Sequence, residues 1–197
     1  MKKPKIEKEE KLTFNKIEIL IMIVLVAFII VSATLVVTIT TRNKNVSNIK
    51  SDTDYIVSAA KNAYNSFKIT DKTSNIVTGS DGSTIGMCIT VKGIKEKEFL
   101  TEKYDNYEGY VVVEESPGNK YNYSVWLTNK KYVINGYDST KIKDLSIKKG
   151  IEKYNNDDFT SKVRTSFTGT TTDKGGISTD KNNLKRYEAA CINEKIE

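Results

Sequence analysis

The sequence contains no histidine, and its 197 residues include only two cysteines, two prolines and one tryptophan. Without histidine, the chain cannot form a Ser-His-Asp or Cys-His catalytic arrangement, or the usual imidazole zinc site. It also lacks a P-loop, a glycine-rich dinucleotide motif and a nucleophile elbow. We therefore predict a protein that is not an enzyme and has no cofactor.

The pattern of charged residues does not predict a metal site or a nucleic-acid-binding site. Neighbouring acids such as Glu114-Glu115 and Asp157-Asp158 are typical of solvated surface, and no loop matches an EF-hand. A Ca²⁺ site near residues 155–158 or around Asp81 stays open as an alternative, but we predict no metal. The net charge is +6, and no dense Lys/Arg patch interleaved with aromatic residues occurs beyond the N-terminus. We predict no specific nucleic-acid partner.

One segment has no charge, no glycine and no proline: residues 19–41. A helix over this run is long enough to cross a hydrocarbon core of about 30 Å. The run exceeds the roughly 7–15 apolar residues of a cleaved secretory signal, which therefore fits less well. We predict a single transmembrane helix, with the lipid bilayer as its partner.

The flanking charges indicate the orientation of this helix. Lysine is frequent before the apolar run and sparse after it, and Lys and Arg near a span are retained in the cytoplasm. The basic residues before the run are Lys2, Lys3, Lys5, Lys8, Lys11 and Lys16, and those just after it are Arg42, Lys44 and Lys50. We expect a cell-membrane protein with a cytoplasmic N-terminus, whose chain lies outside the membrane from about residue 43.

A single acid, Glu18, stands at the leading edge of the apolar run. A carboxylate there is costly unless it meets a cation or water, which makes it a candidate functional residue. In a helical assembly it would pair with the free amine of a neighbouring subunit. The alternative is a solvated Glu18 in the headgroup region, or one paired with Lys16 or Lys11.

The segment Thr13-Phe14-Asn15-Lys16-Ile17-Glu18-Ile19-Leu20-Ile21, after a lysine-rich leader, resembles the start of a type IV pilin or pseudopilin. The resemblance implies cleavage between Thr13 and Phe14 by a prepilin peptidase and methylation of the new Phe14 amine. It also implies that Glu18, fifth from Phe14, aligns each subunit with other pilin-like subunits. The sequence departs from the family pattern at Thr13, where the family has glycine, and at Asn15 and Lys16.

A second helical pattern follows the apolar run. Apolar or small residues recur every three or four positions, on one helical face. They are Ile49, Thr53, Ile56, Ala60, Ala63 and Phe67, with Tyr64 beside them, whereas Asp52, Asp54, Lys61, Asn62 and Lys68 fall mostly off this face. We predict one helix from about Phe14 to Phe67, in which residues 43–45 are the weakest point.

The remaining residues predict a small antiparallel sheet. Pro117-Gly118 is typical of a type II turn between strands, and a second turn at 128–130 leads to a third strand. Residues 70–86 are predicted to be a loop, and Thr90 is predicted to cap a short helix over 91–100. The predicted strands are 109–113, 120–127 and 131–134, and the face that packs on the long helix carries Val111, Val113, Val125, Leu127 and Val133, or is the alternate face.

The C-terminal third is less clear. Residues 139–154 predict a short helix or an extended connection, and 165–183 predict a loop or hairpin. Residues 187–191 are apolar enough to dock on the core. Cys88 and Cys191 are compatible with one disulfide in an oxidising compartment or with two buried thiols.

Together these patterns predict an α+β fold in which a long N-terminal helix packs on a small antiparallel sheet, as in pilins. The predicted segments are a leader (1–13), a transmembrane helix (14–42), its exposed amphipathic continuation (43–68) and an extracytoplasmic head (69–197). We expect a structural subunit of a type IV pilus-like or pseudopilus filament. The alternative is a single-span surface-binding protein that does not polymerise.

Overall fold

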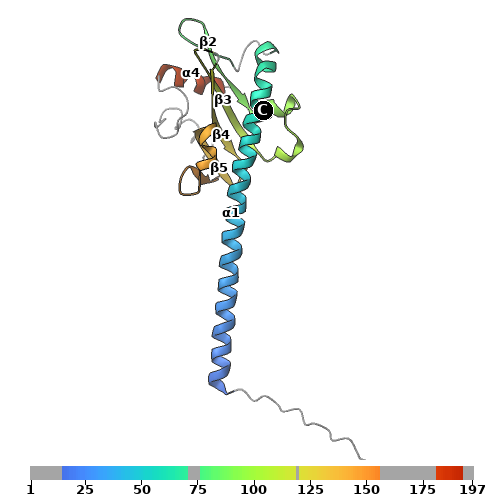
Figure 1. Ribbon diagram of the computed structural model, residues 1–197, viewed down its shortest axis with the longest axis vertical. Coiled ribbons are helices and arrows are strands. Elements are labelled where there is room, and N and C mark those ends of the chain that lie inside the picture. The colour runs from blue at the N-terminus through green and yellow to red at the C-terminus, as the bar shows by residue number, and fades with distance from the viewer. Residues whose placement is uncertain (1–14, 71–75, 119, 156–180, 193–197) are drawn as a thin grey trace, which may run out of the picture. The chain divides into compact units, whose positions relative to one another are not determined.

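The computed structural model describes residues 15–70, 76–118, 120–155 and 181–192 (Figure 1). The chain forms two compact units, residues 1–44 and 45–197. The expected processing site, Thr13 and Phe14, lies outside the described residues. So does the expected loop or hairpin at 165–183, apart from its last three residues.

Helix α1 (Lys16–Thr70) begins in the first unit and ends in the second. It is one uninterrupted α-helix of 55 residues, so the weak point expected at residues 43–45 does not break it. In the first unit its large apolar side chains are exposed; Ile29, for example, is 64% exposed. The apolar run is thus uncovered by any other described residue.

The second unit contains the last part of α1, a six-stranded antiparallel sheet and short helices. The strands pair in sequence order, β1-β2-β3-β4-β5-β6. The elements are β1 (Ile76–Thr78), β2 (Thr84–Thr90), α2 (Val91–Glu96), η1 (Glu102–Tyr104), β3 (Glu108–Ser116), β4 (Lys120–Thr128), β5 (Tyr132–Asp138), η2 (Ser139–Asp144), β6 (Ile151–Lys153) and α4 (Lys181–Ile192). The α+β class is therefore confirmed.

The predicted three-stranded meander is present as β3, β4 and β5, with Gly118 at a φ of 83° in the first turn. The prediction of a loop over 70–86 is wrong, because β1 and the start of β2 lie there. Only residues 79–83 form the turn between these two strands. The polar and glycine-rich sequence of residues 70–86 hides the two strands, which are held by pairing of β1 with β2 and of β2 with β3 rather than by local preference.

Helix α2 has the predicted N-cap. The Gly93 N–H donates to Thr90 Oγ1 at 2.9 Å, and Val91 and Ile94 are buried. The helix ends at Glu96 rather than at residue 100, because the chain reverses at Glu98, which has a φ of 60°. Residues 139–154 contain both predicted possibilities, a short helix (η2) and an extended strand (β6).

One face of the sheet packs on the second-unit part of α1. Four residues of the predicted helical face, Ile49, Ile56, Ala60 and Ala63, are buried in this core together with the neighbouring Tyr64, and Thr53 of the same face is fully buried as well. The sheet contributes Val111, Val113, Val125, Leu127 and Ile134. Ile134 takes the place predicted for Val133, because it pairs with Leu127 and residues directly opposite each other share a face.

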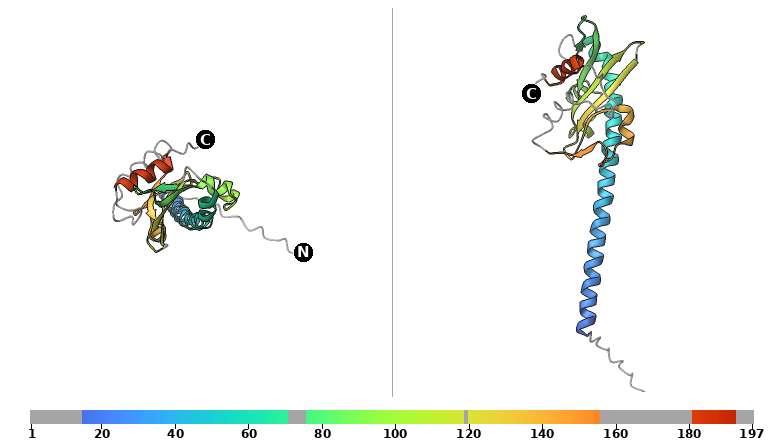
Figure 2. Two further views of the ribbon diagram at one scale, coloured as in Figure 1. Left: turned by 90° about the horizontal axis from the view of Figure 1, so that it is seen from above. Right: turned by 90° about the vertical axis from the view of Figure 1, so that its left-hand side faces the viewer.

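The opposite face of the sheet is covered by α4, so the sheet lies between two helices (Figure 2). Tyr187 and Cys191 of α4 are fully buried against a cluster that includes Trp126 and Val112. Cys88 and Cys191 are joined by a disulfide with an S–S distance of 2.04 Å. Of the two states that the sequence left open, the structure contains the disulfide.

Candidate functional site on helix α1

The apolar run of α1 is the most unusual surface of the described chain. Among the described residues, one helix is long and apolar enough to cross a membrane, and it contains this run. None of its most apolar stretch is buried. Exposed apolar area of this extent needs a lipid environment or other helices to cover it.

Two hydroxyl groups within the run have partners inside the helix. Thr34 Oγ1 donates to the Val31 carbonyl at 2.8 Å, and Thr38 Oγ1 donates to the Thr34 carbonyl at 2.8 Å. A hydroxyl without a partner is costly in hydrocarbon. These threonines can therefore enter a bilayer without another polar group.

Glu18 caps the start of α1. The Asn15 backbone N–H donates to Glu18 Oε2 at 2.9 Å, and the Ile19 N–H donates to the Asn15 carbonyl at 3.1 Å. This is the glutamate half of a capping box, in which the third helical residue reaches back to the cap residue. Within the described residues Glu18 makes no ion pair, with Lys16 or any other cation; Lys11 lies outside them.

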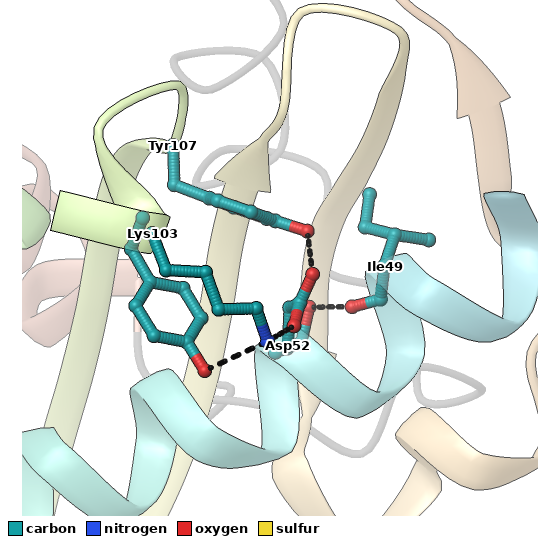
Figure 3. A network of polar contacts seen from close by, with 6 residues as sticks. Ile49, Asp52, Lys103 and Tyr107 are labelled. Atoms are coloured by element: carbon teal, nitrogen blue, oxygen red, sulfur yellow. Dashed lines mark hydrogen bonds and ion pairs between the residues drawn. The ribbon is translucent and has the colours of Figure 1, made fainter. Parts of the chain in front are cut away.

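In the second unit, Asp52 joins α1 to the segment before β3 (Figure 3). Tyr107 Oη donates to Asp52 Oδ2 at 2.8 Å, and Lys103 Nζ lies 3.0 Å from Oδ1. Tyr55 stacks on Tyr104 with ring centroids 5.0 Å apart. Sequence reasoning placed Asp52 off the buried face and missed these contacts, because its partners lie about 50 residues away and carry no motif.

Two groups that contact Asp52 have raised pKa values. Burial, followed by the hydrogen bond to Asp52, raises the pKa of Tyr107. The hydrogen bond to Asp52 raises the pKa of the exposed Lys103 ammonium, and its charge also lies over the Tyr104 ring at 4.9 Å. The fully buried Thr53 next to Asp52 donates its hydroxyl to the Ile49 carbonyl at 2.6 Å. The contacts of Asp52 with Lys103 and Tyr107 stabilise the packing of α1 on the segment that precedes β3.

A second tyrosine cluster holds α1 at the β3–β4 turn. Tyr64 Oη donates to Glu115 Oε1, and the Tyr64 ring meets Tyr121 edge-on at 5.4 Å. Burial, followed by the hydrogen bond to Glu115, raises the pKa of Tyr64. Lys61 Nζ lies 4.9 Å from the centre of the Tyr123 ring. We assign this cluster a structural role.

On the opposite face of the sheet, Tyr187 anchors α4 beside the disulfide. Tyr187 Oη donates to the Ile85 carbonyl at 2.7 Å, and burial raises the pKa of its phenol. A side chain at Gly86 would overlap both the Val113 carbonyl and the Tyr187 ring. Glycine at this position of β2 therefore makes room for α4.

The described residues contain no group of three or more His, Cys, Asp or Glu side chains placed to hold a metal. Asp81 closes the β1–β2 turn: its Oδ1 accepts from the Ser83 hydroxyl at 2.6 Å and from the Ser83 N–H at 3.0 Å. These bonds lower the pKa of the Asp81 carboxyl. Of residues 155–158, only Asn155 is described.

Comparison of the chain with protein-family models, with curated proteins and with solved structures finds no match.

Proposed function

We propose that this protein is a membrane-anchored, non-catalytic subunit of a type IV pilin-like or pseudopilin-like filament. The observation that carries the proposal is an uncovered apolar run on α1, led by a single acid, Glu18, at the fifth position from Phe14. In this proposal the first unit anchors the chain, and the apolar run later packs against the same run of other subunits.

Insertion of the run is favoured by its composition. It contains fifteen Ile, Leu, Val and Phe residues, which together favour membrane insertion by about 5–9 kcal/mol. One carboxylate at the edge of the span, where water and lysines are near, costs far less than an acid at the centre. Glu18 is therefore compatible with insertion.

Two observations support an extracytoplasmic second unit. Lysines are concentrated before the run, which favours a cytoplasmic N-terminus. The second unit also contains the Cys88–Cys191 disulfide, and disulfides persist mainly in oxidising compartments.

A second candidate function is a single-span anchor that does not polymerise. The hydrogen bond from the Asn15 N–H to Glu18 favours it, because this role of the carboxylate needs no second subunit. The stiff, β-branched Thr13 at the expected cleavage position favours it as well.

The test separates the charge of Glu18 from its capping role. Glu18→Gln removes the charge but keeps an oxygen that can accept from the Asn15 N–H, and Glu18→Ala removes both. If the charge aligns subunits, both variants lose filament assembly in a filament preparation. Loss in Glu18→Ala alone assigns the residue to capping. Normal assembly of Glu18→Ala contradicts the alignment role.

Intact mass of the chain from its native membrane separates the two functions. Loss of residues 1–13 with gain of one methyl group supports the filament subunit. A full-length chain favours the anchor.

Topology is tested independently. Alkaline washing should leave the protein in the membrane, and protease added to whole cells should digest the second unit. Thiol labelling of the unfolded, unreduced protein should find no free cysteine. Release by alkali or full protection from protease contradicts the proposed anchoring or orientation.

A further inference from the structure

Helix α4 covers one face of the sheet with few buried side chains of its own (Figure 2). Among its described side chains, at residues 185–191, Tyr187 and Cys191 are buried. They lie in a cluster that is separate from the core between the sheet and α1, and we call it the α4 cluster. Its buried members from the strands are Val77, Cys88, Tyr110, Val112 and Trp126.

The hydrogen bonds of α4 to the sheet are few and reach backbone carbonyls. Tyr187 Oη donates to the Ile85 carbonyl at 2.7 Å, and Arg186 donates to the Thr78 carbonyl at the end of β1. Arg186 is partly exposed, so water competes for its bond. A helix of 12 residues is marginal in water on its own. Helix α4 therefore depends on its docked position to stay helical.

The disulfide restricts how far α4 can move from the sheet. Cys88 of β2 and Cys191 of α4 are 103 residues apart in the chain. Without the bond, docking of α4 has to close a long loop, which costs conformational entropy. With the bond in place, Cys191 stays beside β2, and the few other contacts of α4 are enough to complete the docking.

The core on the other face of the sheet does not depend on α4. Within the described residues, that core includes Ile56 of α1 with Val111 and Leu127 of the sheet, and it includes no residue of α4. The strands pair with one another in sequence order through their backbones. Release of α4 would therefore leave both the α1 core and the strand pairing in place.

We infer that the Cys88–Cys191 disulfide is a redox latch: its reduction by a dithiol releases α4 and uncovers the sheet face around Trp126, while α1 stays packed on the other face. One thiolate of the dithiol attacks a cysteine sulfur and breaks the S–S bond. The second thiol of the reductant then displaces that cysteine. Two electrons and two protons pass to the protein, which gains two thiols, and the dithiol becomes a disulfide. The latch requires neither a filament nor a membrane anchor.

Both sulfurs are shielded while α4 is docked. Cys88 is 1% exposed and Cys191 is 0% exposed. Because the attacking thiolate has to reach a sulfur, α4 must first move away from the sheet within the limit set by the bond. At low dithiol concentration the rate of reduction therefore measures the equilibrium between docked and open α4.

The first experiment reduces the folded full chain with dithiothreitol in mild detergent. Trp126 is the only tryptophan and is fully buried, so its fluorescence should shift to longer wavelength when α4 leaves. Amide hydrogen exchange protection should be lost at residues 185–191 and kept at residues 49–64. Protection that persists at 185–191, or that is lost in both segments, overturns the latch.

A pair of variants on opposite faces of the sheet tests whether the opening is local. Tyr187→Phe removes the hydrogen bond to Ile85 and should speed reduction about five-fold. Ile56→Ala weakens the α1 core and should leave the rate unchanged, because the opening of α4 does not break that core. An unchanged rate in Tyr187→Phe, or faster reduction in Ile56→Ala, overturns the latch.

A measurement on the parent chain makes the test independent of how well the variants fold. The rate of reduction is followed in urea at concentrations below the unfolding transition. Opening of α4 alone exposes little surface, so the logarithm of the rate should rise with urea much less steeply than global unfolding requires. A slope equal to that of global unfolding would show that the whole second unit must unfold before the disulfide is reduced, and it overturns the latch.

Discussion

Helix α1 contains two stretches with opposite environments. Residues 19–41 are apolar on all sides and exposed, whereas residues 49–64 are apolar on one face, and that face is buried against the sheet. A helix that is apolar all round belongs in lipid or among other helices, and a helix with one apolar stripe belongs on a core. The comparison shows that one continuous helix can leave one apolar part uncovered and complete a core with the other.

The largest expected contrast comes from one substitution made in both stretches. Ile56→Ala should lower the free energy of unfolding of the second unit by about 2–5 kcal/mol, because Ile56 is fully buried and its loss leaves a cavity. Ile29→Ala should leave that free energy unchanged, since Ile29 is 64% exposed. Denaturant unfolding in mild detergent measures both. An equal loss of unfolding free energy in both variants would show that the two stretches do not differ in their contribution to the core.

Retention of the protein in the membrane should depend on residues 19–41 and not on residues 49–64. Ile29→Arg places a charge at the centre of the apolar run and should cost about 2.5–3.5 kcal/mol of insertion, which lowers the insertion equilibrium constant on the order of a hundred-fold and increases the fraction that alkali extracts. Tyr55→Arg, at a half-exposed position of the covered stretch, is the control and should not change retention. Alkaline extraction of membranes measures the bound fraction. If both variants are retained like the parent chain, the run does not span a bilayer.

Alkaline pH should weaken the packing of residues 49–64 of α1 in the second unit. Tyr64 and Tyr107 hold α1 on the sheet, and burial raises the pKa of each above its ordinary value of about 10. Below pH 10 both are protonated whether the chain is folded or not, and above pH 10 the unfolded chain releases their protons first. Stability should therefore fall as pH rises above about 10.

The measurement is denaturant unfolding at several pH values, with the double variant Tyr64→Phe and Tyr107→Phe as comparison. Because phenylalanine cannot ionise, the decline above pH 10 should be shallower in the double variant. An unchanged pH dependence would mean that other groups cause it.

The smallest expected effect is at the start of α1. Glu18→Ala removes the acceptor of the Asn15 N–H and a negative charge at a helix N-terminus, which together stabilise the first turn by about 0.3–1 kcal/mol. Amide hydrogen exchange in micelles should become faster in the first turn of α1, with no change at residues 49–64. Unchanged amide hydrogen exchange in the first turn of α1 would contradict the capping role of Glu18.

Local signals predicted much of the fold. The Thr90 cap, the Pro117-Gly118 turn, the meander and the buried stripe of α1 all depend on residues close in the sequence, and the structure confirms them. The loop predicted at 70–86 failed because β1 and β2 are short, polar at their ends and stabilised by pairing. The inward position of Ile134 instead of Val133 reflects strand register, which includes an irregularity between Val125 and Trp126.

The candidate site was predicted in part. Glu18 was visible as a lone acid beside an apolar run, but its hydrogen bond to the Asn15 N–H required coordinates. Asp52 with Lys103 and Tyr107 was missed, because the contact joins segments about 50 residues apart. The processing role of Thr13 and Phe14 and the assembly role of Glu18 stay predictions.

The amino-acid sequence by itself determined that residues 19–41 are too apolar to be stable in water. It also determined which face of α1 over residues 49–64 is apolar and must be buried. Both properties depend on residues within a few helical turns. Only the tertiary structure decided the strand register, the helix on each face of the sheet and the Cys88–Cys191 pairing. These features depend on contacts between distant residues, which no local pattern records.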